Sequence, residues 1–277
     1  MREILHFAKS DLASFRMTRM KALNNEFKQE KVNEVWQEVW ASSVVSKEIF
    51  ENQLFIEAWK VFEKYIPKDA KMVLEAGGGS GRFGLKIAKD LPNSKVVVID
   101  IVESSLGLIK KLAEEMKLEN ISVSQDDVLK LSFPDNHFDV VFSDAVIQHV
   151  PDDKQALKEM SRVLKPGGVL VVSVVNLWGF HTLYKTWLKL AGRQYEYKSE
   201  RAYSKKELRK LVEDHGMEIV AEDGFYPAYG ILRLKKRNKI FKLLGRICNR
   251  STKILDRFTN RFFSRNFGFE LVVVGRK

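Results

Sequence analysis

The chain has 277 residues, of which 45% are hydrophobic and 30% are charged, a composition that describes an ordinary globular protein with a large buried core. Its 16 glycines and 6 prolines exclude collagen-like and disordered classes, and its longest apolar runs are far shorter than the roughly 18 residues that cross a bilayer. The single cysteine, Cys248, cannot form an internal disulfide, and the first residues carry no apolar stretch of signal-peptide length. We therefore expect a reducing, cytoplasmic setting.

The net charge of +11 at neutral pH is concentrated in one part of the chain. Residues 233–265 contain 12 Lys or Arg side chains and a single acid, Asp256, so this segment alone accounts for the whole excess of positive charge. The rest of the chain is neutral on balance. Because a uniformly basic nucleic-acid-binding protein spreads its charge over a face of the fold, we treat residues 233–265 as a separate feature, the basic segment.

Residues 1–66 carry helical patterns and are expected to form an N-terminal helical cap. Val32, Trp36 and Trp40 recur at a spacing of four residues, and a second apolar stripe follows between residues 56 and 66. Such a cap would pack near the carboxyl ends of the strands that follow, or extend the edge of their sheet.

From residue 71 onward, short β-branched runs alternate with helical patterns. Strands are predicted at residues 71–76, 95–100, 121–125, 138–143 and 169–175, and helices at 81–89, 104–117 and 153–164. A capping box from Ser204 to Glu207 opens a further helix, and two more strands are expected near residues 217–223 and 268–275. The alternation predicts an α/β fold with a doubly wound, mostly parallel seven-stranded sheet. Helical insertions are expected at about residues 177–203 and 225–266.

A glycine-rich turn joins the first predicted strand to the first predicted helix, with the sequence LEAGGGSGRFG at residues 74–84. Such a turn brings main-chain N–H groups and the positive end of a helix close to an anionic ligand group. A GxGxxG pattern begins at Gly79, and Asp100 ends the next strand, as in sites that bind a nicotinamide dinucleotide. The same turn also contains ExGxGxG, beginning at Glu75, with an acid two positions before the first glycine.

Four stretches of the chain resemble the class I S-adenosylmethionine-dependent methyltransferases, most closely the small-molecule subgroup that includes ubiquinone and menaquinone C-methyltransferases. The stretches are VLEAGGGSGRFG at 73–84, VVVIDI at 96–101, DDVLKLSFPDNHFDVVFSDAVIQHV at 126–150 and LKEMSRVLKPGGVLVVSV at 157–174. The resemblance implies a Rossmann-like methyltransferase domain over residues 67–277, with an antiparallel last strand. It also implies S-adenosylmethionine as the cofactor and S-adenosylhomocysteine as the product, in preference to a nicotinamide dinucleotide.

The resemblance assigns roles to residues of the predicted cofactor site. Asp100 would accept hydrogen bonds from the ribose hydroxyls, and Asp127 aligns with the aspartate that meets the adenine amino group in the family. Glu75 would hold the ammonium group of the cofactor through water, or would only cap the turn that follows it. The residues predicted to bind the cofactor are Glu75, Gly77, Gly78, Gly79, Gly81, Asp100, Ile101, Asp127, Val128 and Ser143.

His149 is the candidate catalytic residue, because it occupies a position after the fourth strand where the resembled family often has a histidine near the transferred methyl group. An imidazole has a suitable pKa for a general base when the acceptor must lose a proton. The alternative is a structural histidine that caps the loop before Pro151. His181 and Tyr184, in the first insertion, are further candidates for contact with the acceptor, with apolar packing as the alternative. No cluster of Cys and His has metal-ligand spacing, so no metal is predicted.

Basic and apolar residues of the basic segment form two stripes about 100° apart on a helix, which predicts a basic amphipathic helix. Such a helix can lie on an anionic membrane surface, grip phosphates, or fold its apolar stripe onto its own domain. Nucleic acid is the less favoured partner, because the neutral remainder of the chain offers no second basic surface.

The sequence therefore predicts an S-adenosylmethionine-dependent methyltransferase that acts on a small organic or lipid-like acceptor. We expect it in the cytoplasm, with peripheral membrane contact through the basic segment. The alternatives are an RNA or protein methyltransferase that docks through the basic segment, and a catalytically silent relative that only binds the nucleotide.

Overall fold

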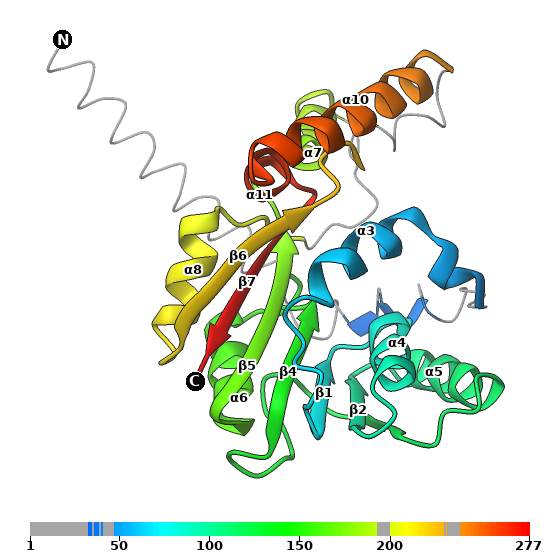
Figure 1. Ribbon diagram of the computed structural model, residues 1–277, viewed down its shortest axis with the longest axis vertical. Coiled ribbons are helices and arrows are strands. Elements are labelled where there is room, and N and C mark those ends of the chain that lie inside the picture. Colours follow the sequence, from blue (N-terminus) through cyan, green and yellow to red (C-terminus); the bar gives the residue numbers. More distant parts are fainter. Residues whose placement is uncertain are drawn as a thin grey trace, which may run out of the picture.

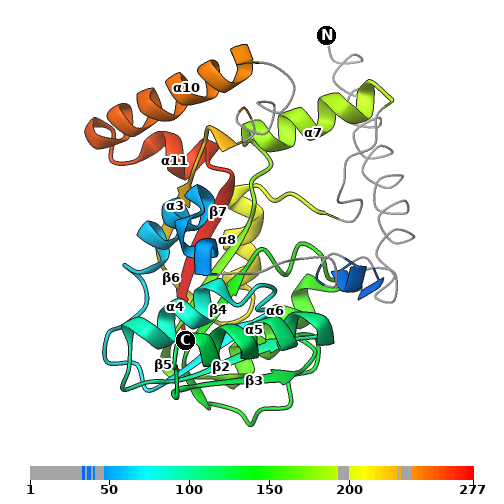
Figure 2. The same cartoon turned by 90° about the vertical axis from the view of Figure 1, so that its right-hand side faces the viewer.

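The computed structural model describes residues 33, 34, 36–38, 40, 47–192, 200–229, 231 and 239–277. Its centre is a single sheet of seven strands, shown in two orthogonal views (Figures 1 and 2). The strands are β1 (Met72–Ala76), β2 (Lys95–Asp100), β3 (Ile121–Gln125), β4 (Phe138–Asp144), β5 (Leu164–Val175), β6 (Glu218–Phe225) and β7 (Glu270–Arg276). Their order across the sheet is β3-β2-β1-β4-β5-β7-β6.

The sheet is parallel from β3 to β5, and β7 enters between β5 and β6 antiparallel to both. This arrangement confirms the predicted mostly parallel sheet with an antiparallel last strand. The strand β5 begins five residues before its predicted start, at Leu164, because Leu164 already pairs with Phe138 and a register shift then precedes the pairing of Val140 with Val169.

Helices cover both faces of the sheet and are crowded at its carboxyl-terminal edge (Figure 1). The helices are η1 (Lys47–Glu51), α3 (Gln53–Phe62), α4 (Arg82–Asp90), α5 (Glu103–Glu115), α6 (Asp153–Val163), α7 (Phe180–Leu190), α8 (Lys205–Glu213), α10 (Lys239–Phe258) and α11 (Phe262–Phe267). The core on one face contains residues of α3, α4 and α5, and the core on the other face contains residues of α6 and α8. The capping box is present at α8, where the Ser204 side chain and Glu207 bond to each other's main chain.

The helix α3 is anchored by aromatic contacts with the central sheet. The Phe62 ring lies 5.1 Å from Phe83, 4.9 Å from Phe142 and 5.5 Å from Phe225, measured between ring centroids. These edge-on contacts bury Phe62 completely, and such pairs stabilise a core beyond the effect of their buried area. Residues 1–32 of the expected N-terminal cap lie outside the described residues.

The basic segment forms two helices where a single stripe was expected. The helix α10 ends at Phe258, and Asn260 and Arg261 then adopt positive φ angles of 46° and 61°. The Asp256 carboxylate explains the break, because it accepts hydrogen bonds from the main-chain N–H groups of Phe263 and Ser264 and so caps α11. Residues 232–238 lie outside the described part of the chain, as do the side chains of residues 239–242.

In the part of the chain that the structure describes, no helix is both long enough and apolar enough to cross a membrane. The helices α7, α10 and α11 instead lie together beyond the carboxyl ends of β4 and β5, at the top of both views (Figures 1 and 2).

Candidate functional site

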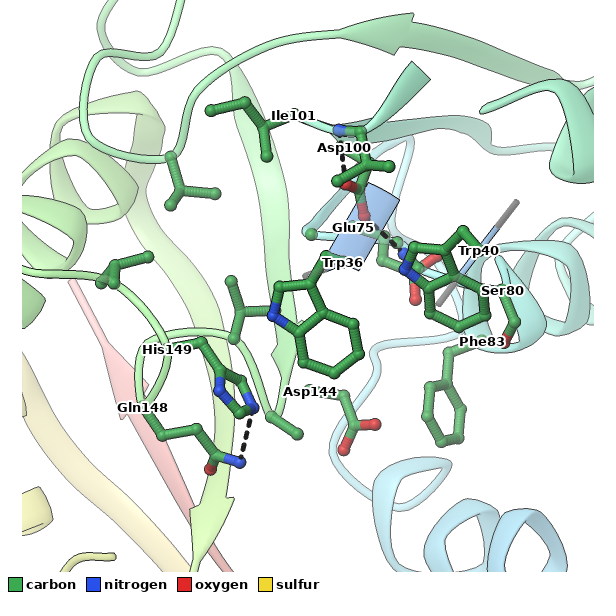
Figure 3. Close-up of a pocket in the computed structure, with 18 of the residues that line it drawn as sticks. Trp36, Trp40, Glu75, Ser80, Phe83, Asp100, Ile101, Asp144, Gln148 and His149 are labelled. Carbon is green, nitrogen blue, oxygen red and sulfur yellow. Dashed lines mark hydrogen bonds between the residues drawn. The ribbon is translucent and has the colours of Figure 1, made fainter. Parts of the chain in front are cut away.

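A cavity of about 330 Å³ opens at the carboxyl ends of β1, β2, β4 and β5. This is the edge at which open α/β sheets bind their ligands, and the volume falls in the usual range for small-molecule sites. Figure 3 shows residues from the first two βα turns facing side chains from the segment after β4. Sequence-predicted residues that line the cavity are Glu75, Gly77, Gly78, Gly79, Asp100, Ile101, Asp127, Val128 and His149.

The glycine-rich turn leaves no room for side chains between β1 and the cavity. Gly77 has a φ angle of 82°, and a Cβ atom added there would clash with the Val146 side chain. Gly81 has a φ angle of 69° at the start of α4, and a Cβ atom there would lie 2.6 Å from Ile109. Gly81 therefore shapes the turn without lining the cavity itself.

Asp100 is the last residue of β2, and its carboxylate is anchored at the edge of the cavity. Its Oδ2 atom accepts a hydrogen bond of 2.7 Å from the N–H of Gly79, and its Oδ1 atom accepts one of 2.9 Å from the N–H of Val102. Burial raises the pKa of the Asp100 carboxyl, and the two N–H donors oppose that shift. The residue is 8% exposed and lines the cavity, so its remaining lone pairs are within reach of a ligand.

The sequence left two roles open for Glu75, in β1, and the structure shows the capping role. Its Oε2 atom accepts a 2.8 Å hydrogen bond from the N–H of Gly84, in the first turn of α4, so Glu75 does cap the turn that follows it. Its side chain also lines the cavity. Burial raises the pKa of Glu75 to about 8, although the Gly84 N–H lowers it in part. A cation that enters the cavity would favour the ionised form.

Asp126 and Asp127 both line the cavity, in the loop after β3. Asp126 uses both carboxylate oxygens within the loop, for Ser132 and for the N–H of Asp127. Asp127 uses Oδ1 for the N–H of Leu129. The hydrogen bonds therefore favour Asp127, the residue predicted from the sequence, as the one that presents an oxygen atom to a ligand.

Ser143 is not among the residues that line the cavity, although it was predicted to be in the site. The residue is fully buried, and its hydroxyl group donates a 3.1 Å hydrogen bond to the main-chain oxygen of Ala76. The side chain thereby links β4 to the end of β1.

His149 lies at the opposite wall of the cavity, held by the residue before it. The Gln148 side chain receives a 2.6 Å hydrogen bond at Oε1 from the N–H of Val175, which directs its amide nitrogen to His149 Nε2 at 3.2 Å. In that orientation the amide donates and Nε2 accepts, so the ring proton of a neutral His149 is on Nδ1. The Trp36 ring packs against His149 in a T-shaped contact with centroids 5.0 Å apart (Figure 3).

Two carboxyl groups that the sequence did not single out share one hydroxyl group beside the cavity. The Ser173 Oγ atom lies 2.6 Å from Oδ1 of Asp144 and 2.8 Å from Oε2 of Glu270. The hydroxyl has a single proton to donate, so one of the two carboxyl groups must itself be protonated. Arg82 lies 3.0 Å from Asp144 and stabilises its anion. Burial and the Asp144 charge raise the pKa of Glu270 well above its usual value, so Glu270 holds the proton.

The far end of the cavity includes Val175, Glu200, Tyr229 and Phe269. Glu200 accepts a hydrogen bond at Oε2 from Lys185 of α7. Burial raises the pKa of Glu200, but His181 and Lys185 lower it by more, so that the pKa is about 2. His181 is buried behind this wall with its ring centroid 4.8 Å from Phe269, and neither His181 nor Tyr184 lines the cavity. His181 thus supports the wall from behind, whereas the Tyr184 ring stacks on Trp187 within α7.

Among the described residues, no group of three or more His, Cys, Asp or Glu side chains is placed to hold a metal ion.

Comparisons with known proteins agree with this geometry. A family model described as a methyltransferase domain matches residues 67–223, more than half of the chain. The chain belongs to this methyltransferase family. The methyltransferase is 28% identical over 241 residues to demethylmenaquinone methyltransferase of Staphylococcus aureus, an alignment that covers 78% of this chain and 97% of that protein.

Solved methyltransferases share the fold. A methyltransferase solved in complex with the Trm112 activator of Haloferax volcanii is 17% identical, with a TM-score of 0.61 over 87% of this chain and 96% of that chain. A Thermotoga maritima protein, described as a possible histamine N-methyltransferase, is 20% identical, with a TM-score of 0.54 over 80% of this chain and 88% of that chain. At these identities, the likeness extends to the fold and not to the acceptor.

The cofactor of this methyltransferase is S-adenosylmethionine. The residues present fit that molecule, because the cavity offers a carboxylate at Asp100 for vicinal hydroxyls and a second at Glu75 for an ammonium group. A turn without side chains from Gly77 to Gly79 separates them.

Proposed function

We propose that this methyltransferase transfers the methyl group to a small, largely apolar acceptor of a quinone-like or lipid-like kind. The observation that carries the proposal is that the predicted cofactor residues and an apolar wall line the same cavity. The wall is formed by Trp36, Val175, Tyr229 and Phe269.

The likeness to demethylmenaquinone methyltransferase supports the quinone-like form of the proposal. That relative matches 78% of this chain and 97% of its own length, and its name describes a quinone-type acceptor. A quinone ring with a prenyl tail is flat and apolar, as the aromatic wall requires.

The cofactor supplies a methyl group that its sulfonium charge activates toward a nucleophile. In this reaction, the chain has to bind the donor at Asp100, Asp127 and Glu75, place the acceptor in line with the methyl group, and exclude water. When the attacking atom of the acceptor carries a proton, that proton must be taken up by the chain. His149 Nε2 is the predicted acceptor of the proton, and it would have to exchange its contact with Gln148 for one with the acceptor.

An acceptor with a lipid tail would be met at a membrane surface, so the proposal extends to peripheral membrane contact through residues 233–265. Arg246, Arg250 and Arg257 are exposed there. Such an acceptor would reside in a bilayer or in a detergent micelle and not free in water.

The test is the fate of a radioactive methyl group. Protein is incubated with S-adenosylmethionine that carries tritium in its methyl group, together with a detergent-solubilised cell extract, and the products are divided into organic-soluble, RNA and protein fractions. We expect the label in the organic-soluble fraction. Label confined to RNA or protein would overturn the acceptor class, and no transfer to any fraction would indicate a catalytically silent relative.

A further inference from the structure

Exposed apolar side chains are concentrated on three helices at one end of the molecule. Of the 14 large hydrophobic side chains that are exposed in the described part of the chain, 13 belong to α7 with the turn before it, to α10 or to α11. The exception is Val220 on β6. Single exposed apolar residues need no explanation, but their concentration marks an interaction surface.

The helix α7 turns one stripe to solvent and the other to the cavity wall. Its exposed residues recur every three or four positions and are Phe180, Leu183, Trp187 and Leu190, at 40%, 53%, 53% and 83% exposure. On its inner side, His181 and Leu188 are buried. His181 packs on Phe269, which lines the cavity. The inner side of α7 therefore supports the cavity wall, while its outer side carries the exposed stripe.

The helix α10 repeats this division with positive charge added. Thr252 and Asp256 are buried on its inner side. Its exposed apolar residues are Leu243, Leu244, Ile247, Ile254, Leu255 and Phe258. At 100° per residue, exposed Arg246, Arg250 and Arg257 lie along one flank of that apolar stripe.

Other basic residues of the segment hold the helices to the domain. Arg261 forms a 3.0 Å ion pair with the buried Asp223 on β6, and Arg265 lies 4.0 Å from the same carboxylate. Lys253 pairs with Glu57 of α3. Within the described part of the chain, no ion pair involves Arg246, Arg250 or Arg257, so these three charges are available to a partner.

We propose that the outer sides of α7, α10 and α11, here the helical face, dock on an anionic lipid bilayer. Trp and aliphatic side chains beside arginines are the composition of helices that lie in the membrane interface, where the apolar stripe enters the acyl boundary and the arginines meet lipid phosphates. A phosphate-binding face for RNA would not need the apolar stripes. The three arginine charges attract an anionic surface and repel a cationic one.

Docking on a bilayer would bring the protein to a lipid-like acceptor, and only this consequence rests on the proposed function. A lipid-like acceptor in the docked bilayer would lie near α7, whose His181 packs on the cavity residue Phe269. Binding to vesicles is measured without catalysis, whereas methyl transfer in detergent micelles is measured without a bilayer. Failure of one is therefore distinguishable from failure of the other.

The test is co-sedimentation of the full chain with vesicles of phosphatidylcholine, with and without 30% phosphatidylserine. We expect binding only to the anionic vesicles, with weaker binding at high salt. Replacing Arg246, Arg250 and Arg257 with Gln should lower the partition coefficient by about fivefold per charge, or about a hundredfold together. A second variant, Trp187→Gln with Leu190→Gln, should lower binding without any change in charge.

A control variant removes the same charge from the other end of the molecule, with Gln in place of the exposed Lys89, Lys110 and Lys111. It should bind vesicles like the intact protein, and all variants should keep its melting temperature within a few degrees. The proposal is overturned if the intact protein does not bind anionic vesicles at low salt. It is also overturned if the control variant loses as much vesicle binding as the arginine variant. It is also overturned if the helical face binds RNA and not vesicles.

Discussion

The carboxylate of Asp100 accepts a 2.7 Å hydrogen bond from the main-chain N–H of Gly79, and so ties the end of β2 to the glycine-rich turn after β1. The bond fixes the position of both parts of the predicted cofactor site at once. Asp100 therefore has two tasks, since it shapes the turn and also offers its remaining lone pairs to a ligand.

Replacing Asp100 with Ala should weaken the binding of S-adenosylmethionine by roughly 1 to 3 kcal/mol, because charge-assisted hydrogen bonds to the ribose are lost. Titration calorimetry measures the change. The control is Asp135→Ala, which removes an exposed carboxylate that pairs with Arg162 outside the cavity and should leave the affinity unchanged. Equal affinities for the intact protein and the Asp100 variant would remove Asp100 from the cofactor site.

The affinity for S-adenosylmethionine should rise with pH between about 6 and 7.5. The pKa of Glu75 is raised to about 8 without ligand, so the carboxyl is mostly protonated over this range, and an ammonium group beside it must displace the proton. Proton release gives an increase of up to about tenfold per pH unit. Calorimetry in buffers of different ionisation enthalpy measures the protons directly.

The matched variant for this pH dependence is Glu75→Gln, which keeps the shape and cannot ionise. Its affinity should be lower and nearly flat over the same range. If the intact protein itself shows a flat profile, Glu75 does not meet the ammonium group and serves only to cap α4.

If His149 is the general base, His149→Ala should lower kcat by about two or more orders of magnitude with little change in the affinity for the cofactor. The measurements are turnover with the labelled lipid extract and calorimetry with the cofactor. Near-normal turnover in this variant would leave His149 a purely structural residue that packs against Trp36.

Glu270→Gln should fold and should become more stable, relative to the intact protein, as pH rises. The raised pKa of Glu270 means that its contribution to the free energy of unfolding is full below the ordinary carboxyl pKa of about 4.5 and is lost as pH rises through the folded-state value. Glutamine can still donate to Ser173 and has no proton to lose. Urea unfolding at pH 6 and at pH 9 measures the difference.

The matched variant for Glu270 is Asp144→Asn, which leaves the Arg82 guanidinium without its anionic partner and should destabilise the fold at both pH values. A Glu270→Gln protein that loses the same stability at every pH would show that the proton is not held where the hydrogen bonds place it.

The sheet could be predicted from the sequence because its strands are buried on both faces and read as continuous β-branched runs. The cofactor half of the cavity could be predicted for the same reason, because Glu75 lies in a predicted strand and Asp100 ends one. Local signals with a defined geometry, such as the capping box from Ser204 to Glu207, are found in place.

The other half of the cavity has no such signal. Glu270 reaches it because β7 enters between β5 and β6, which pairs Glu270 with Val175, 95 residues earlier in the chain. The division of the basic segment into α10 and α11 was likewise missed, because it depends on the Asp256 carboxylate and on the pairing of Arg261 with the distant Asp223. Such contacts depend on tertiary packing, which periodicity does not describe.

The most direct test of the proposed cofactor site is the electron density of S-adenosylhomocysteine in a crystal structure of its complex with this protein. We predict the ribose hydroxyls against Asp100, the adenine edge at Asp127 and Val128, and the sulfur atom facing the part of the cavity between Asp144 and His149. An adenosyl group placed elsewhere, with no ligand atom within hydrogen-bond distance of Asp100, would contradict it.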